Sequence, residues 1–227
     1  MTILLVLATF AIFLTIDYFY SKAKHPVVQV APAISRARSA TAAAAPKPNL
    51  VGGFAVPNHL RYHPGHTWSL GESPNLVRIG MDDFAIKLTG KVEHVNLPQR
   101  GQWIRQGQKV WSLVRNDVRI DMVSPIEGSV ADINDAVAND PVLIGKDPYG
   151  EGWLVTVQSP DAKTNFRNLL GGALARWWTE ESSVRLQRLM PSAIGALAQD
   201  GGVALDDVAS TLPDEQWVKV TREFFLT

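Results

Sequence analysis

Cysteine is absent from this chain of 227 residues. Its absence excludes disulfides, thiolate zinc sites, cysteine-ligated iron–sulfur clusters and thiol nucleophiles. An excess of positive charge is also absent, because the 22 Lys and Arg residues equal the 22 Asp and Glu residues in number. No basic run carries interleaved aromatic residues, so the sequence does not indicate a nucleic-acid-binding protein.

Motifs of catalytic sites are missing as well. The sequence contains no G-x-S-x-G motif and no glycine loop of the kind that holds phosphates. His63 and His66 stand on either side of Pro64-Gly65, a pattern that predicts a turn because no third candidate ligand lies nearby. We therefore expect a protein that is not an enzyme, with no metal site and no cofactor.

The chain begins with an apolar stretch over residues 3–20, ILLVLATFAIFLTIDYFY. Eighteen helical residues reach about 27 Å, which just spans the apolar core of a bilayer. No basic residue precedes the stretch and no small-residue cleavage site follows it, which favours an uncleaved anchor over a signal peptide. Lys22 and Lys24 follow it, so the positive-inside rule predicts a single-pass inner- or plasma-membrane protein whose globular domain is cytoplasmic.

Four regions are expected along the chain. Between the anchor and the first strand-like runs, Ala and Pro are frequent, and five basic residues meet no acid over residues 21–50. Pro26, Pro32, Pro46 and Pro48 rule out a continuous helix there, so this region is predicted to be a linker. The expected regions are a transmembrane anchor (1–22), the linker (23–57), a β domain (58–161) and a helical extension (162–227).

Short runs of strand-forming residues, separated by Gly, Pro, Asn and Asp, fill the expected β domain. Acids at the start of DDFAIKL predict one short helix from Asp82 to Leu88. The pattern is typical of a mostly β barrel or sandwich. Strands are predicted over residues 67–70, 76–81, 90–97, 103–104, 109–115, 118–123, 128–133 and 153–157.

The stretch from Gly107 to Gly128 predicts a β-hairpin. Apolar and polar residues alternate with a period of two on both sides of Asn116-Asp117. Both residue types tolerate the positive φ of a tight turn, so Asn116 and Asp117 are expected to form the exposed hairpin tip.

The region over residues 62–161 resembles the H-protein of the glycine cleavage system, a member of the lipoyl and biotinyl carrier-domain group. The resemblance implies a mostly β, lipoyl-domain-like barrel-sandwich hybrid with a C-terminal helix. The matching segments are Tyr62 with His66-Thr67-Trp68, VRIGMDDFAIKLTGKVEHVNLP (77–98), Gly101, Gly107, SPIEG (124–128), NDAVANDPVLI (134–144) and DPYGEGWL (147–154).

This sequence departs from the family pattern at the lipoyl attachment site. In the family, the acceptor lysine lies ten residues after the glycine that enters the hairpin and eight before the proline that leaves it, and both counts lead to Asp117. A carboxylate has no amine with which to form the lipoyl amide. The resemblance therefore implies a tip without a lipoyl group. We expect this tip to present an ionic, partner-binding surface that consists of Arg115, Asn116, Asp117 and Arg119.

The region after Asp161 has a helical pattern. Phe166, Leu170, Ala173 and Trp177 follow one another at helical spacing, and the run ends at Pro191. Further helices are predicted over residues 192–199, over 205–210 and from Thr211 onward. This extension either caps the barrel or offers a docking face that uses whichever of Trp177, Trp178 and Trp217 stays exposed.

Together these features predict a membrane-anchored, H-protein-like protein without the lipoyl lysine, which serves as a non-catalytic scaffold and binds a protein partner in a membrane complex. One alternative is a working lipoyl carrier for glycine cleavage or related one-carbon or acyl transfer, modified on Lys87, Lys91 or Lys109. Another is a membrane-fusion-type adaptor of a transport system, which would need a coiled-coil insertion where this hairpin has a two-residue turn.

Overall fold

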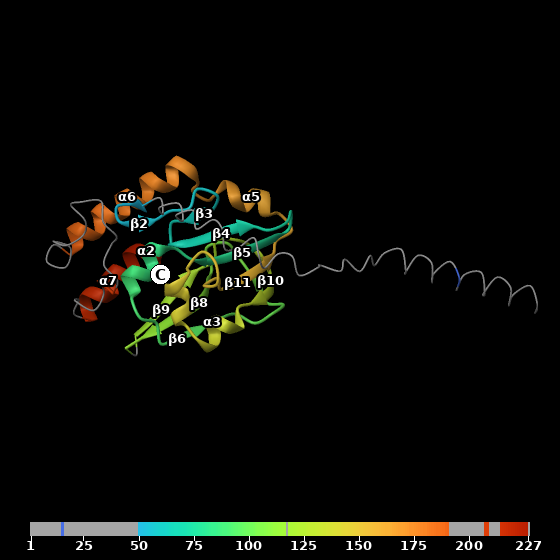
Figure 1. The fold of residues 1–227 in the computed structure, drawn as a ribbon, viewed down its shortest axis with the longest axis horizontal. Coiled ribbons are helices and arrows are strands. Elements are labelled where there is room, and N and C mark those ends of the chain that lie inside the picture. The colour runs from blue at the N-terminus through green and yellow to red at the C-terminus, as the bar shows by residue number, and fades with distance from the viewer. Residues whose placement is uncertain (1–14, 16–49, 117, 191–206, 209–213, 227) are drawn as a thin grey trace, which may run out of the picture. The chain divides into compact units, whose positions relative to one another are not determined.

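The computed structural model describes residues 15, 50–116, 118–190, 207–208 and 214–226 (Figure 1). The chain divides into two units, 1–47 and 48–227, and the elements below belong to the second. The expected anchor and most of the expected linker lie outside the described residues. Within the described ranges, no helix is both long enough and apolar enough to cross a bilayer.

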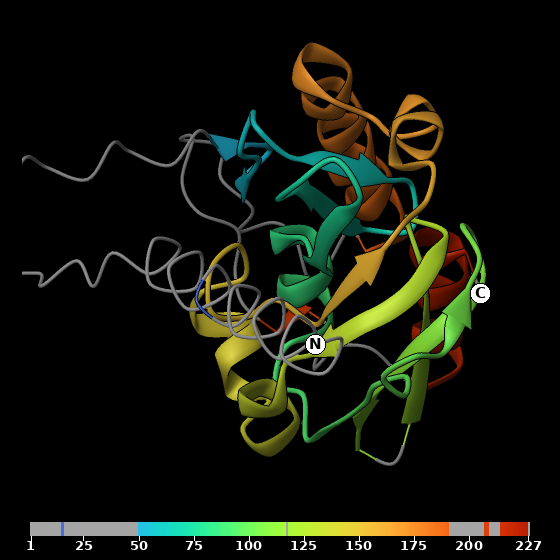
Figure 2. The ribbon, with the colours of Figure 1, turned by 90° about the vertical axis from the view of Figure 1, so that its right-hand side faces the viewer.

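A six-stranded antiparallel sheet forms one side of the domain (Figures 1 and 2). Its spatial order is β3-β4-β5-β11-β10-β7, so β11, late in the chain, lies between β5 and β10. The strand bounds are β3 Arg61–His63, β4 Thr67–Gly71, β5 Leu76–Met81, β7 Trp103–Ile104, β10 Gly128–Ile133 and β11 Val155–Gln158. The prediction of a mostly β domain is confirmed for the described residues.

A second sheet of three antiparallel strands carries the hairpin. It consists of β6 (His94–Asn96), β8 (Lys109–Arg115) and β9 (Val118–Val123), in the order β6-β8-β9. A separate pair, β1 (Leu50–Val51) and β2 (Phe54–Ala55), precedes the large sheet.

The core is built from the inward-facing residues of both sheets, as the period of two predicts. Ile79 and Val157 from the large sheet and Leu113, Ile120 and Met122 from the small one are all almost fully buried in one cluster. Packing of this kind is the main stabilising contribution to a domain of this size.

Helix α2 (Asp83–Thr89) agrees with its prediction to within a residue. Asp82 is its N-cap, and its Oδ1 accepts a hydrogen bond from the Ala85 N–H at 2.8 Å. Gly90 ends the helix with φ of 67°, a conformation that suits glycine. The strand predicted from residue 90 therefore begins only at His94. Helices α3 (Asp135–Asn139) and α4 (Val142–Lys146) were not predicted, because each is little more than one turn long.

The long helix expected after Asp161 is interrupted. The structure has α5 (Ala162–Arg167) and α6 (Gly172–Leu189) instead. Between them, Leu170 exchanges two backbone hydrogen bonds of 2.8 Å with Tyr62, at the edge of the large sheet. Gly171 and Gly172, expected inside the helix, form its start. The pairing with Tyr62 therefore outweighs the helical pattern of the sequence.

The chain's last described helix is α7 (Asp214–Phe225), close to the predicted position. It contacts β9 and α6. Its residues Trp217, Val220, Phe224 and Phe225 are buried in the same cluster as the sheet residues, together with Leu186 of α6. The predicted helix over residues 192–199 lies outside the described residues, as does all of 205–210 except Asp207 and Val208.

Candidate functional site at the hairpin tip

The β8–β9 hairpin has the predicted register. Arg115 pairs with Val118 as the last pair before the turn, which leaves Asn116 and Asp117 between the strands. Asn116 has φ of 46°, the left-handed conformation expected at a tight turn. Asp117 itself lies outside the described residues.

Arg115 does not occupy the exposed position predicted for it. Its side chain is buried, with the residue only 7% exposed. Its Nη1 donates a hydrogen bond of 2.6 Å to the carbonyl oxygen of Thr89, at the C-terminal end of α2, where a cation is favourable. Its Nη2 lies 2.6 Å from Oδ1 of Asp207 in the extension. Arg115 therefore holds the hairpin in place, and the prediction that it is displayed at the tip is wrong.

Arg119 and Asn116 are exposed, as predicted. The Arg119 side chain is 68% exposed, and its Nε lies 2.8 Å from Oδ1 of Asp121. Lys109 Nζ lies 3.7 Å from the other oxygen of Asp121. The solvent face of the hairpin thus presents one carboxylate, Asp121, next to two cations, Arg119 and Lys109, which supports the ionic character predicted for this surface.

A second loop lies beside the tip. The Glu93 N–H donates to the carbonyl oxygen of Val114 at 3.0 Å, so the segment between α2 and β6 runs along the end of β8. Lys91, in this segment, is exposed. Of the other two lysines considered as carriers, Lys109 is exposed, whereas Lys87 is 7% exposed and its Nζ lies 2.8 Å from Asp83 Oδ2. A buried, ion-paired amine is poorly placed for modification.

Sequence reasoning missed a buried polar cluster at the start of α2. His66 Nδ1 lies 2.8 Å from Asp82 Oδ2, and the imidazole stacks on Phe84 with ring centroids 4.1 Å apart. Asp83 accepts a hydrogen bond from the Ala55 N–H and pairs with Lys87. The spacing of Asp83 and Lys87 at i and i+4 was a usable signal for that pair. The His66–Asp82 pair joins distant segments and had none.

His63 belongs to a turn, as predicted. Its Nδ1 accepts a hydrogen bond from the Gly65 N–H at 3.0 Å. Burial, with a smaller contribution from the nearby His66, lowers the pKa of His63 from 6.5 to about 4. Among the described residues, no three His, Asp or Glu side chains are grouped so as to hold a metal ion.

The DPYG segment (residues 147–150) has a structural role. The Tyr149 hydroxyl donates to the carbonyl oxygen of Ala55 at 2.6 Å and accepts from the Asp83 N–H at 2.9 Å. Burial raises the pKa of Tyr149 well above its ordinary value. Trp68 Nε1 donates to the carbonyl oxygen of Pro148 at 3.0 Å. These contacts tie β2, α2 and the large sheet together.

The three tryptophans considered for docking differ in burial. Trp217 is 5% exposed and lies on the side of α7 that faces the core. Trp178 is half-buried against His66, with ring centroids 4.5 Å apart. Trp177 is 64% exposed, next to the exposed Leu174 on α6. Trp177 alone of the three remains available to a partner.

Residues 60–180 match the family described as Glycine cleavage H-protein. The chain belongs to this family. The glycine cleavage system H protein of Coprothermobacter proteolyticus is 37% identical over 102 residues, which cover 45% of this chain and 80% of the relative. The H protein of Anaeromyxobacter sp. (strain K) is 31% identical over 126 residues, which cover 56% of this chain and 97% of the relative. An H protein from Mycobacterium marinum, whose structure is solved, aligns with a TM-score of 0.47 and 25% identity over 56% of this chain and 98% of that one.

The family assignment confirms the resemblance read from the motifs over residues 62–161, and with it the H-protein-like β fold. The prediction of a single-pass membrane protein with a cytoplasmic globular domain is contradicted by the relatives, which are glycine cleavage H proteins. That prediction rested on the hydropathy of residues 3–20, which lie outside the described residues except Thr15.

Proposed function

We propose that this chain is a non-lipoylated H-protein that serves as a non-catalytic binding or scaffold subunit. The observation that carries the proposal is Asp117, at the position where the family's motif has the lipoyl lysine. Lipoylation joins the carboxyl carbon of lipoate to a lysine amine, and the Asp117 carboxylate has no nitrogen for that bond. The burial of Lys87 removes one of the three substitute lysines.

The hairpin is the proposed contact surface, in a form that excludes Arg115. Asn116 and Arg119 are exposed, and Asp121 and Lys109 extend the charged face along the strands. Exposed charges of this kind contribute about 0 to 1 kcal/mol to folding. At an interface, loss of one side of a buried charge pair costs about 2 to 5 kcal/mol of binding. The surface therefore suits recognition better than stabilisation.

The partner proposed is a protein of the glycine cleavage system, because the relatives carry the name of that system. Its contact surface should itself carry mixed charge, since the hairpin presents both signs. The membrane-associated complex expected from the sequence is not retained, since it depended on the membrane location corrected above.

Lipoylation in the presence of a lipoate ligase tests the absence of the carrier function. The wild-type chain should keep its polypeptide mass, whereas Asp117→Lys, which restores an amine at the tip, should gain one lipoyl group. A lipoylated H protein of the family serves as the positive control for the ligase. Stoichiometric lipoylation of the wild type would overturn the proposal, and peptide mapping would then show whether Lys91 or Lys109 carries the group.

Partner binding is tested with the double substitution Asn116→Ala and Arg119→Ala. Binding to purified proteins of the glycine cleavage system should weaken about tenfold or more, while the melting temperature stays unchanged. Arg167→Ala, at an exposed arginine on α5 away from the hairpin, is the matched control and should bind like the wild type. Equal binding by both variants would move the interface away from the hairpin.

The adaptor alternative is disfavoured by the register of the hairpin. Arg115 pairs directly with Val118, which leaves two residues for the turn and no room for a coiled-coil insertion. A carrier modified on Lys91 or Lys109 remains the second candidate, because both amines are exposed and Lys91 lies beside the tip.

A further inference from the structure

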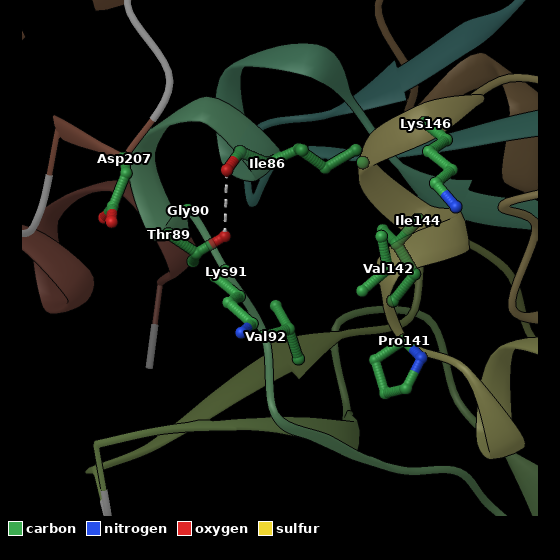
Figure 3. A pocket seen from close by; sticks show the side chains of 11 residues that line it. Ile86, Thr89, Gly90, Lys91, Val92, Pro141, Val142, Ile144, Lys146 and Asp207 are labelled. Carbon is green, nitrogen blue, oxygen red and sulfur yellow. Dashed lines mark hydrogen bonds between the residues drawn. The ribbon is translucent and has the colours of Figure 1, made fainter.

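A pocket of about 330 Å³ opens between α2 and α4 (Figure 3). Ile86 from α2 and Ile144 from α4 are almost fully buried and form apolar walls. Val92, after α2, and Val142, at the start of α4, complete the apolar lining, and Figure 3 shows their side chains around the same hollow. The size is at the lower end of the range for small-molecule sites, and a mostly apolar lining is typical of them.

Two ammonium groups stand at the edge of this pocket. Lys91 lies on the side of α2 and Lys146 on the side of α4 (Figure 3). Both side chains are exposed, and within the described ranges neither forms an ion pair. The single acid in the lining, Asp207, is paired with Arg115. The charge that faces a ligand is therefore positive.

Thr89 supplies the one hydroxyl among the described residues that line the pocket, and this hydroxyl already donates a hydrogen bond. The Thr89 hydroxyl donates within its own helix, at 2.8 Å to the carbonyl oxygen of Ala85 and 3.2 Å to that of Ile86. Apart from the lysines at its edge, the pocket is lined mainly by apolar side chains, which suit an aliphatic chain better than a sugar, a base or a peptide. The combination of apolar walls with cations at the edge is complementary to an anionic amphiphile.

We propose that this pocket binds a medium-chain carboxylate of about six to ten carbons. The chain would lie against Ile86, Val92 and Val142, and the carboxylate would meet Lys91 or Lys146 at the edge. One non-hydrogen atom takes up about as much volume as a water molecule, about 30 Å³. The ten non-hydrogen atoms of octanoate therefore need about 300 Å³, close to the pocket volume of about 330 Å³. The pocket adjoins the hairpin, because Thr89 and Asp207 in its lining both bind Arg115, but the inference does not rest on the function proposed above.

Gly145 allows a clean test. A Cβ built on this residue would approach only the Ile86 Cγ2 atom within 4 Å, at 3.8 Å, so a larger side chain there projects into open space. Gly145 lies within α4 and lacks the positive φ that would strain another residue. Gly145→Leu should therefore fill the pocket while the fold is kept, and Gly145→Ala is the control that changes the backbone in the same way but leaves the pocket open.

The experiment is a calorimetric and NMR titration of the full chain with butanoate, hexanoate, octanoate and dodecanoate, and with octanol as the uncharged probe. Affinity should rise about fourfold per methylene up to about eight to ten carbons and then level off. Octanol should bind several-fold more weakly than octanoate. NMR shift changes should centre on Ile86, Val92 and Ile144.

The variants locate the site. Gly145→Leu should abolish octanoate binding and Gly145→Ala should retain it, with the melting temperature as the check on folding. Replacing Lys91 or Lys146 by Gln should weaken binding about two- to fivefold, whereas Lys163→Gln, at an exposed lysine on α5, should have no effect. The lysine variants keep the test valid if Gly145→Leu does not fold.

Three results would overturn the inference. The first is no saturable octanoate binding at millimolar concentration. The second is octanol binding as tight as that of octanoate, which would remove the role of the lysines. The third is an affinity that keeps rising with chain length up to dodecanoate and that is unchanged in Gly145→Leu, which would indicate detergent-like adsorption to some other surface.

Discussion

Arg115 and Asp207 form an ion pair, with Nη2 and Oδ1 2.6 Å apart, that joins the hairpin to the C-terminal extension. The same guanidinium binds the carbonyl oxygen of Thr89 at the end of α2. One side chain thus connects three segments that lie far apart in the sequence. The extension is therefore joined to the domain next to the tip as well as through the apolar contacts of α7 with β9.

The first prediction concerns this pair. Arg115→Ala should lower the free energy of unfolding by about 2 to 3 kcal/mol, because it leaves the Thr89 carbonyl and the Asp207 carboxylate without their cation. Arg119→Ala, four residues away and exposed, should cost less than about 1 kcal/mol. Urea denaturation measures both values. Equal, small losses would show that Arg115 adds nothing to stability.

The second prediction is a pH dependence that arises from His63. Its pKa is lowered to about 4 in the folded chain by burial and by His66, so between pH 4 and 6.5 the unfolded chain binds more protons. The stabilisation by neutral His63 is complete above pH 6.5 and is lost as the pH falls toward 4. The loss should be about 2 kcal/mol, after allowance for partial exposure of the ring.

His63→Asn is the control for this effect. Asparagine can accept the Gly65 N–H bond in the same turn but does not titrate. Its urea-measured stability should fall less than that of the wild type between pH 6.5 and 4.5, with the difference attributable to His63. Parallel pH profiles for the two proteins would contradict the assignment.

The third prediction compares two tryptophans of the extension. Trp217→Ala should cost about 3 to 5 kcal/mol, because the side chain is buried in the common core and its removal leaves a cavity. Trp177→Ala should leave the melting temperature within experimental error, because that side chain is 64% exposed. A large loss from Trp177→Ala would mean that the exposed face of α6 is itself covered in the folded chain.

The fourth prediction tests the buried start of α2. Asp82→Ala removes both the N-cap bond to Ala85 and the partner of His66, and should destabilise the fold by about 3 kcal/mol. Asp82→Asn keeps an oxygen for the cap and should cost clearly less. If thermal denaturation shows equal losses of stability for the two variants, the hydrogen bond from the Ala85 N–H does not account for the stabilisation by Asp82.

The sequence by itself determined the domain and its chemistry at the tip. Alternation with a period of two placed β5, β8, β9 and β10, because a half-buried strand requires that pattern whatever it packs against. The spacing of Gly107, Asp117 and Pro125, compared with the family's motif, places Asp117 at the lipoyl position, and the proposed absence of a lipoyl group rests on that match. A side chain's functional groups are known from its identity alone.

Only the tertiary structure decided which charged groups are available. From the sequence, Arg115 is expected to be an exposed tip residue. In the folded chain it binds Thr89, 26 positions before it, and Asp207, 92 positions after it, and these contacts bury it. The helix expected through Leu170 is broken by pairing with Tyr62, more than 100 residues earlier. The pocket between α2 and α4 likewise depends on two helices that are distant in sequence. Burial and pairing of this kind arise from contacts between distant segments, which no local pattern records.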